Sequence, residues 1–487
     1  MIITEQSRIA SAEVVQNDPV FLVQESDRPR SDSDPHAEQH TTVLSAEAKE
    51  AAARLSPHPG LENLPTLSQQ PFVGRTEALA RLAASLTEGG GVITQPSATT
   101  VSGLGGIGKT ALALHYAHKH RAQYTLVWWI TAESEEQISS GLADLTLTLY
   151  PDWARRVPLK ERTEWALTWL ETHPGWLLVY DNVERPEHLT PFLGRLLGRG
   201  HQVVTSRCRT GWPDETELIS LDVLNHEAAV DLLCVPGTGQ GDAASGERAP
   251  GDRSQAELLA AELGHLPLAL AQARAYLRET RTGFAAYRAK LLDAAAEAAG
   301  VGDSAAARAI ARICRTSLEA IRARHPLAVS MLHTLAWYAP EALPPVVLEH
   351  MDSSAEETES ALQALTSYHL VSLEPDGIAL HRLLQRTLRE QAPEHLPDAR
   401  GRAERALAAA VTAAPDGVAP FLIHIQALAA TEAAQDAGAD AELALMYRQG
   451  ADELIAREQH VLAIPLLQRV VECDTRLRGI DLDSSEG

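Results

Sequence analysis

Residues 103–110 read Gly-Leu-Gly-Gly-Ile-Gly-Lys-Thr, which matches the phosphate-binding loop (P-loop) pattern G-x-x-x-x-G-K-[S/T]. Glycines let the backbone curl so that its N–H groups point at phosphate oxygens. The lysine then reaches the β- and γ-phosphates, and the threonine hydroxyl ligates Mg²⁺. An expected strand at 98–103 precedes the loop, and an apolar helical stretch at 111–117 follows it. This strand–loop–helix order predicts an α/β fold that binds a nucleoside triphosphate.

We therefore expect the loop and the residue after it to bind the nucleotide, through Gly103, Gly105, Gly106, Ile107, Gly108, Lys109, Thr110 and Ala111. The same glycines also satisfy the dinucleotide-binding pattern G-x-G-x-x-G. That alternative requires an acidic residue about 20 positions further on to bind a ribose, and Glu133 lies close to that position. A lysine and a threonine directly after the last glycine have no use in dinucleotide binding, so the pattern favours a triphosphate with magnesium.

A second feature of the expected site lies at the end of an apolar run, Trp176–Asp181. Such a run is typical of a buried parallel strand, whose carboxyl end faces the phosphates in a P-loop fold. Asp181 is therefore the expected partner of Mg²⁺, together with Thr110. The next apolar run, 201–206, is followed by Arg207, which at the same edge would contact the γ-phosphate and sense its loss. An exposed surface arginine is the alternative interpretation of Arg207.

Composition excludes several classes of protein. The formal net charge of −23 on 487 residues opposes nucleic-acid binding as a bulk effect. The four cysteines form no C-x-x-C pair, so neither a zinc site nor a disulfide framework is indicated. A secretory signal pattern and a membrane-spanning apolar run are both missing from the sequence, which predicts a cytoplasmic protein without a membrane partner.

The N-terminal half divides by composition. Residues 1–70 are polar and rich in turn formers, so we expect them to be largely disordered, with a helical rhythm only at Ser45–Leu55. Residues 71–235 alternate apolar strands with helices, which predicts a P-loop domain with a parallel sheet. Residues 236–252 are rich in glycine and predict a flexible loop.

The C-terminal half reads as helical. We expect an all-α domain at 253–305 and a winged-helix domain at 306–395, because a short hairpin follows several helices there. The expected winged helix is crowded with acidic residues, which argues against direct DNA binding. Residues 396–487 are rich in alanine and leucine and predict further helices, with one helical hairpin at Ala441–Thr475.

The order of motifs over residues 72–395 resembles that of the NB-ARC branch of the STAND ATPases, which are signal-transducing P-loop proteins. Besides the P-loop, the resemblance is carried by Phe72-Val73-Gly74-Arg75, Leu177–Asn182, Thr205–Arg207, Gly264–Leu270 and His381. It implies that Val73 and Arg75 border the adenine and that Pro267 packs against the base. It also implies that Arg207 senses the nucleotide and that His381, in the winged helix, contacts the β-phosphate of ADP.

The hairpin at Ala441–Thr475 resembles the start of a tetratricopeptide (TPR) array, with small and large residues at Ala451, Leu454, Ala463 and Leu467. One such repeat cannot bury its faces alone, since about three stacked repeats are normally needed. We therefore expect either that the chain is truncated or that this hairpin docks onto the preceding helices.

Two positions depart from the family's pattern. The family's Walker B strand commonly ends in two acids, whereas here Asp181 is followed by Asn182. An amide orients water but cannot accept its proton, so we expect slow hydrolysis or none, with Glu184 as a candidate replacement. The family's Met-His-Asp triplet reads Leu380-His381-Arg382, which removes the aspartate that would support His381. A hydrogen-bonded structural residue is the alternative interpretation of this histidine.

Three functions follow as hypotheses, with Lys109, Asp181, Asn182 and Arg207 as the candidate catalytic residues. The favoured one is an ATP/ADP-dependent switch with Mg²⁺, which a protein or ligand bound to C-terminal repeats opens and which then forms homo-oligomers, in bacterial immunity or signalling. The second is an NTP-dependent transcription regulator, which requires a basic DNA-binding region. The third is a P-loop enzyme acting on a small substrate, which requires catalytic groups beyond the nucleotide site.

Overall fold

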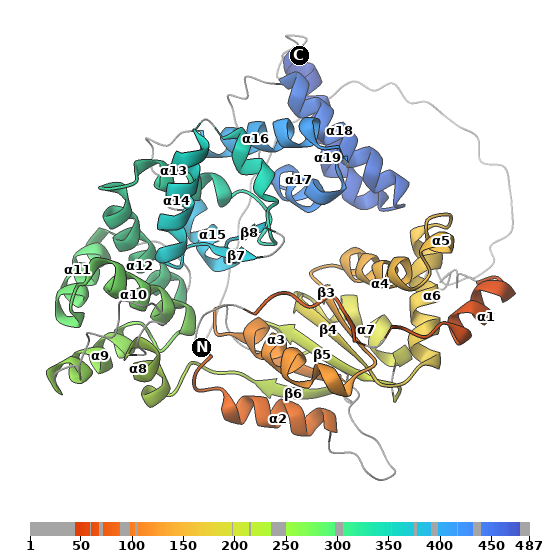
Figure 1. Cartoon of the computed structure of the whole chain (residues 1–487), viewed down its shortest axis with the longest axis horizontal. Helices are drawn as coiled ribbons and strands as arrows, with labels where there is room; N and C mark the ends of the chain where they lie inside the picture. The colour runs from red at the N-terminus through yellow and green to blue at the C-terminus, as the bar shows by residue number, and fades with distance from the viewer. Residues whose placement is uncertain are drawn as a thin grey trace, which may run out of the picture. The chain divides into compact units, whose positions relative to one another are not determined.

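A computed structural model of the chain describes most residues from Leu44 onward. The described ranges are 44–58, 60–67, 72–87, 98–102, 106–196, 198–213, 216–234, 250–297, 305–351, 353–374, 377–390, 398–415, 417–431 and 440–477. They form an α/β part built on one parallel sheet and, after it along the chain, a helical part (Figure 1).

A six-stranded sheet forms the centre of the α/β part, and all of its strands run parallel. In spatial order the strands are β1 (Leu61–Glu62), β3 (Leu126–Thr131), β4 (Trp176–Val183), β5 (His201–Ser206), β2 (Ala98–Ser102) and β6 (Thr216–Ser220). The inner strands β3, β4 and β5 are almost entirely buried, as expected for a parallel sheet that is covered on both faces. The predicted parallel α/β core is thus confirmed.

Alternate residues along each strand point to opposite faces of the sheet, so each strand contributes to two hydrophobic cores. Helices cover both faces. Leu126, Trp128 and Ile130 of β3 enter one hydrophobic core, whereas Val127 and Trp129 enter another. The first core is covered by α4 (Glu135–Leu149), α6 (Leu159–Thr172) and α7 (Pro186–Leu193), and the second by α2 (Thr76–Thr87) and α3 (Lys109–His120). The short helical segments of this part are η1 (Arg121–Gln123), α5 (Pro151–Ala154) and η2 (Gly194–Leu196).

The described residues before position 70 contribute to this fold, while residues 1–43 lie outside the described residues and the expectation that 1–70 are largely disordered stays a prediction. α1 (Ala46–Arg54) begins after Ser45, whose hydroxyl accepts a hydrogen bond from the Ala48 N–H, and it buries Ala48 and Ala52. β1 pairs with β3 at the sheet edge. The helical rhythm at Ser45–Leu55 predicted this helix, but small alanines in a polar segment gave no sign that it packs against the α/β core.

The helical part contains α8 (His226–Cys234), α9 (Pro250–Glu262), α10 (Pro267–Thr280), α11 (Phe284–Glu297), α12 (Ala305–Arg322), α13 (Pro326–Leu335), η4 (Pro345–His350), α14 (Ala355–Ser367), α15 (Arg382–Glu390), α16 (Ala399–Ala413), η5 (Ala419–Phe421), α17 (Leu422–Ala429), α18 (Asp440–Ala456) and α19 (His460–Leu477). Its buried apolar side chains form one hydrophobic core that extends along the chain from Leu224 to Cys473. The predicted helical remainder is thus confirmed, while its division at residues 305 and 395 stays a prediction. Among the described helices, none has both the length and the apolarity to cross a bilayer.

A small hairpin precedes α15. Its strands, β7 (Ser372–Glu374) and β8 (Gly377–Ala379), are antiparallel, and Ile378 exchanges two backbone hydrogen bonds, of 2.9 and 3.0 Å, with Leu343. Gly377 has a φ of 154°, and a Cβ there would lie 2.1 Å from the Leu343 carbonyl oxygen, so a side chain would collide with the backbone. The hairpin leads directly into α15 and so fixes where that helix begins.

The last two helices, α18 and α19, pack against each other and against α16 and α17. A buried polar network joins them to α16: the Tyr447 hydroxyl donates 2.9 Å to Glu404, which pairs with Arg400 at 3.1 Å. Arg400 also donates 3.0 Å to the Leu428 carbonyl. The predicted helical hairpin is therefore present, and it docks onto the preceding helices.

Candidate functional site

The Gly-rich loop leads directly into α3, whose first residues are Lys109 and Thr110. Gly106 and Gly108 have φ values of 75° and 94°, which residues with side chains rarely adopt. Backbone N–H groups in the first turn of a helix lack partners within the helix and carry partial positive charge. Ala111 lies in this turn, and the site is thereby suited to an anion such as phosphate.

Asp181, near the end of β4, is joined to α3 by a hydrogen bond. The Thr110 hydroxyl donates to Asp181 Oδ1 at 2.9 Å, and the Thr205 hydroxyl of β5 donates to the same oxygen. Burial raises the pKa of Asp181, while the two hydroxyl groups and the nearby cations Arg382 and Lys109 lower it. A hydroxyl and a carboxylate oxygen that already touch are the kind of ligands that Mg²⁺ prefers.

Lys109 lies near this carboxylate, and Arg207 lies near Lys109. Burial, and to a lesser extent the charge of Arg207, lower the pKa of Lys109 to about 8, while Asp181 opposes the change. The Arg207 guanidinium lies 3.5 Å from the Glu184 carboxylate, and both side chains are about half exposed. The structure therefore brings the expected Lys109, Asp181 and Arg207 together at one sheet edge, with Arg207 paired to Glu184.

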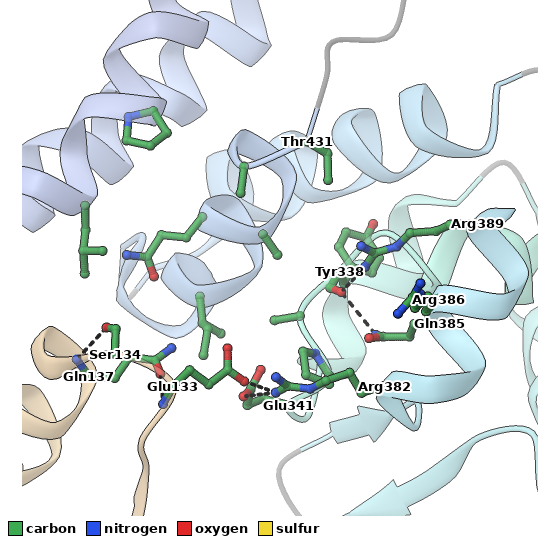
Figure 2. A pocket seen from close by; sticks show the side chains of 18 of the residues that line it. Glu133, Ser134, Gln137, Tyr338, Glu341, Arg382, Gln385, Arg386, Arg389 and Thr431 are labelled. Carbon is green, nitrogen blue, oxygen red and sulfur yellow. Dashed lines mark hydrogen bonds and ion pairs between the residues drawn. The ribbon is translucent and has the colours of Figure 1, made fainter. Parts of the chain in front are cut away.

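An acidic residue that the sequence suggested only for ribose binding lies at the same edge. The Asn182 side chain donates a hydrogen bond of 3.0 Å to Glu133, just beyond the end of β3. Asn182 has a φ of 62°, a left-handed conformation that asparagine tolerates better than most residues. Glu133 also forms an ion pair with Arg382, and Arg382 lies 3.9 Å from Glu341 (Figure 2). Asn182 thus connects the sheet edge that carries Asp181, through Glu133 and Arg382, to the start of α15.

A residue just before α2 contacts the backbone of the phosphate-binding loop. The Arg75 guanidinium is buried and donates 2.8 Å to the backbone carbonyl of Ile107. Val73 is partly buried against the core of the helical part. Arg75 is thus hydrogen-bonded to the loop backbone. The expected contact of Val73 and Arg75 with a base stays a prediction. Gly103 and Gly105 lie outside the described residues.

Residues of α10 and α15 meet over the loop. A Cβ added to Gly106 would lie 3.5 Å from Leu383 and 3.6 Å from Leu268, so both leucines pack next to this glycine. Leu268 follows Pro267, the first residue of α10, and Leu383 is the second residue of α15. The Gly264–Leu270 motif and the segment after His381, both distant from the loop in sequence, therefore lie next to it in the structure.

His381 precedes α15 and lies close to the same loop. Its Nδ1 accepts a hydrogen bond of 3.1 Å from the Leu383 N–H, which places the proton of the neutral ring on Nε2. Burial, with smaller contributions from the charges of Arg382 and Lys109, lowers the pKa of His381 to about 4. The residue as a whole nevertheless keeps solvent-accessible surface. It is therefore a neutral hydrogen-bond donor near Lys109 at physiological pH.

A cavity of about 740 Å³ lies on the other side of the Glu133–Arg382 ion pair (Figure 2). Its walls come from the start of α4, the segment before η4, and the helices α15, α17 and α19, with polar side chains from Gln137, Gln385, Arg386, Gln426 and Thr431 among them. The ion pair thus has the loop edge on one side and this cavity on the other.

Known proteins share parts of this architecture. No protein-family model matches the chain. Over 222 residues it is 30% identical to a protein named regulatory protein AfsR from Streptomyces griseus, a match that covers 43% of this chain and 21% of that protein. A STAND (signal transduction ATPase with numerous domains) protein with a tetratricopeptide repeat sensor from Pyrococcus horikoshii superposes with a TM-score of 0.52 at 13% identity.

The structural match covers 86% of this chain and 57% of the Pyrococcus chain, so the chain spans only part of both known proteins. At 13% identity the likeness shows the fold alone. That fold is a parallel-sheet α/β core followed by a mostly helical remainder, and this level of the predicted fold class is confirmed.

Proposed function

We propose that this chain is an ATP-binding molecular switch of the STAND class, and of its NB-ARC branch. The observation that carries the proposal is the 2.9 Å hydrogen bond from Thr110 to Asp181, formed where α3 begins beside Lys109. A helix N-terminus, a lysine and a hydroxyl–carboxylate pair together suit a triphosphate with its metal. A dinucleotide would use neither the lysine nor the threonine.

Each site residue has a role in this proposal. Thr110 and Asp181 fit Mg²⁺ because they supply hard oxygen ligands, and bound metal would neutralise charge on the β- and γ-phosphates. Lys109 binds the same phosphates, and Arg207 senses the γ-phosphate by exchanging Glu184 for it. The base packs near Val73, Arg75 and Pro267. We expect slow turnover, since Asn182 replaces an acid.

The switch lies in the contacts between the loop and the helical part. We assign α12–α15 with the β7–β8 hairpin to a winged helix, from which His381 donates to the β-phosphate of ADP. Leu268 and Leu383, packed next to Gly106, and the Glu133–Arg382 ion pair support this closed arrangement. A ligand shifts a two-state equilibrium only through contacts that differ between the states. ATP therefore favours opening if its γ-phosphate competes with these contacts.

The C-terminal helices supply the trigger site in this proposal. α18 and α19 form the first hairpin of a TPR-like array, in keeping with the tetratricopeptide repeat sensor named for the Pyrococcus protein. Several apolar side chains of α19 are exposed, among them Val461, Ile464 and Val471, which suits a stacked neighbour. A protein or ligand bound there opens the molecule in the cytoplasm, homo-oligomers form, and the signal serves immunity or another response.

The likeness to regulatory protein AfsR favours a second candidate, a nucleotide-dependent transcription regulator. The net charge of −23 on the 487 residues opposes DNA binding by this chain. A titration of the protein with a mixed-sequence DNA duplex at low salt separates the two candidates. Tight, salt-dependent binding supports the regulator, and its absence supports a switch that acts through protein partners.

Calorimetric titration with ATP·Mg²⁺ tests the proposed function. We expect binding by the unaltered chain and a loss of at least tenfold in affinity in Lys109→Ala, because the lysine supplies charge to the phosphates. Lys119→Ala is the matched control, since Lys119 is exposed at the far end of the same helix. Equal affinity in the Lys109 and Lys119 variants would overturn the assignment of the loop.

A further inference from the structure

Hydrolysis of ATP by this chain needs a proton acceptor that the Asp181-Asn182 pair does not supply. Asp181 is committed to Thr110 and Thr205 through hydrogen bonds, and an amide at Asn182 has no basic oxygen that takes a proton at neutral pH. A carboxylate from elsewhere must therefore reach this edge if water is to be activated there.

Among the residues that directly follow β3 and β4, two carboxylates are close enough to be considered. Glu184 faces Arg207 at 3.5 Å and its side chain is 50% exposed, so it neutralises the candidate sensor. Glu133 lies at the end of the strand next to β4: Thr131 pairs in register with Asp181, and the Ala132 N–H donates 2.8 Å to the Asp181 carbonyl. Its carboxylate is 27% exposed and accepts the Asn182 amide at 3.0 Å.

The local backbone is arranged to make this contact. Asn182 takes the left-handed conformation, with a φ of 62°, and its N–H donates 2.8 Å to the Thr205 hydroxyl. The pairing between β4 and β5 shifts register at the same place, between Tyr180 and Val183. Asn182 is thereby turned out of the strand pairing. Its side-chain amide holds the Glu133 carboxylate one residue away from Asp181 along β4.

We propose that Glu133 is the general base for ATP hydrolysis in this chain and that Arg382 holds it inactive in the closed arrangement, an inference that rests on the proposed function. In the reaction a water oxygen attacks the γ-phosphorus and forms a new P–O bond, while Glu133 accepts a proton from that water. The bond from the γ-phosphorus to the β–γ bridging oxygen breaks, and its electron pair leaves with ADP. The proton then passes from Glu133 to phosphate or solvent, which restores the carboxylate.

Arg382 supplies the restraint. Its guanidinium forms an ion pair with Glu133 and lies 3.9 Å from Glu341, and Figure 2 shows both carboxylates turned toward it. A carboxylate oxygen that accepts hydrogen bonds from a guanidinium is occupied and is not free to take a proton from water. Because Arg382 begins α15, movement of α15 away from the sheet edge removes the pairing. Hydrolysis is therefore low while the molecule is closed and rises once it opens.

Single-turnover hydrolysis of radiolabelled ATP·Mg²⁺ by five purified proteins tests this inference: the unaltered chain, Glu133→Gln, Arg382→Gln, the double variant of these two, and the matched control Glu135→Gln. We expect Glu133→Gln to lower the rate about 100-fold or more, as for loss of a general base. Arg382→Gln raises the rate several-fold, but not in the Glu133→Gln background. Glu135→Gln retains the rate within about threefold, because Glu135 is exposed in the first turn of α4.

Release of a fluorescent ADP analogue supplies a readout that does not depend on hydrolysis. Glu133→Gln and Arg382→Gln both break the same ion pair, so both speed release to a similar extent, while Glu135→Gln does not. If Glu133→Gln lowers hydrolysis and Arg382→Gln raises it while both speed ADP release, Glu133 acts as a base. A merely structural role of Glu133 would give the two variants similar effects on hydrolysis as well.

The outcomes separate the inference from the proposed function. If the unaltered chain binds no ATP, the proposed function fails first. If ATP binds and Glu133→Gln hydrolyses it at the unaltered rate, or if neither the unaltered chain nor Arg382→Gln hydrolyses bound ATP, the assignment of Glu133 is overturned. A rate in Arg382→Gln no higher than in the unaltered chain overturns the restraint by Arg382. Retained ATP binding in each variant shows that it is folded.

Discussion

The indole Nε1–H of Trp165 donates a hydrogen bond of 2.9 Å to the backbone carbonyl of Ala48, which ties α1 to α6. A second indole, from Trp169, donates 2.6 Å to the Leu55 carbonyl at the end of α1. Both tryptophans are fully buried. α1 is therefore a lid over two large aromatic side chains, and its loss would expose them to water.

The first prediction follows from this contact. Ala52, on the inner face of α1, is fully buried, whereas its neighbour Ala53 is exposed. Ala52→Asp places an unpaired charge in the core and should lower the free energy of unfolding by at least about 1 kcal/mol, or detach α1. Ala53→Asp should change it by less than about 0.5 kcal/mol. Urea denaturation followed by tryptophan fluorescence measures both, and equal midpoints for the two variants would show that α1 is not docked in solution.

The second prediction concerns the metal. Thr110→Ala removes a ligand and leaves Asp181 without its partner from α3. We expect affinity for ATP to become nearly independent of Mg²⁺, and affinity for ATP·Mg²⁺ to fall about tenfold or more. Asp181→Ala should weaken the dependence, whereas Thr110→Ser keeps the hydroxyl and should retain it. Titrations with and without the metal decide the matter, and full Mg²⁺ dependence in Thr110→Ala would place the metal elsewhere.

The third prediction concerns protons at Lys109. Its pKa is lowered to about 8 by burial and by Arg207, so above that pH much of the lysine is neutral before a ligand binds. Phosphate raises the pKa again, so binding takes up protons and weakens as pH rises above about 8. Calorimetry in buffers of different ionisation enthalpy should show marked uptake at about pH 8.5 and little at about pH 7.

Lys109→Arg is the control for this measurement, because a guanidinium stays protonated throughout the range. Uptake that persists in Lys109→Arg would assign the proton to another group. Equal uptake at both pH values by the unaltered chain would mean that the lysine is fully charged before binding.

Much of the candidate site was predictable because its signals are local. The apolar run before Asp181 identified β4, since a buried parallel strand is apolar on both faces. The loop glycines and Lys109 marked the start of α3 for a similar reason, because left-handed φ values and a helix start are properties of a few consecutive residues. Such features survive without knowledge of the tertiary fold.

Other parts depend on contacts between distant segments. Glu133 meets Asn182 because β3 and β4 are neighbours, and it meets Arg382 because α15 reaches the same edge. No pattern in the sequence predicts either of these two contacts of Glu133. Arg75 donates a hydrogen bond to the Ile107 carbonyl, a contact that depends on where the loop backbone passes and that the sequence did not indicate.

The last prediction concerns His381 as the latch of the closed state. Its Nδ1 accepts the Leu383 N–H at 3.1 Å, so Nε2 carries the proton and can donate it to a β-phosphate oxygen. A hydrogen bond to a charged group contributes on the order of 1.5–3 kcal/mol, which is about tenfold or more in affinity. We therefore expect His381→Ala to weaken ADP binding by at least about tenfold and to promote homo-oligomers without a trigger.

His381→Asn is the matched control, because its amide still offers an N–H donor and should recover part of the affinity. The pKa of His381 is lowered to about 4, so the ring is neutral on both sides of pH 6.5 and its contribution to ADP binding should be constant from about pH 5.5 to 8. Stopped-flow ADP release and light scattering measure the two effects. Unaltered ADP affinity together with an unaltered oligomeric state in His381→Ala would make this histidine a structural residue, and the ion pair of Glu133 with Arg382 would then be the next contact to test as the latch.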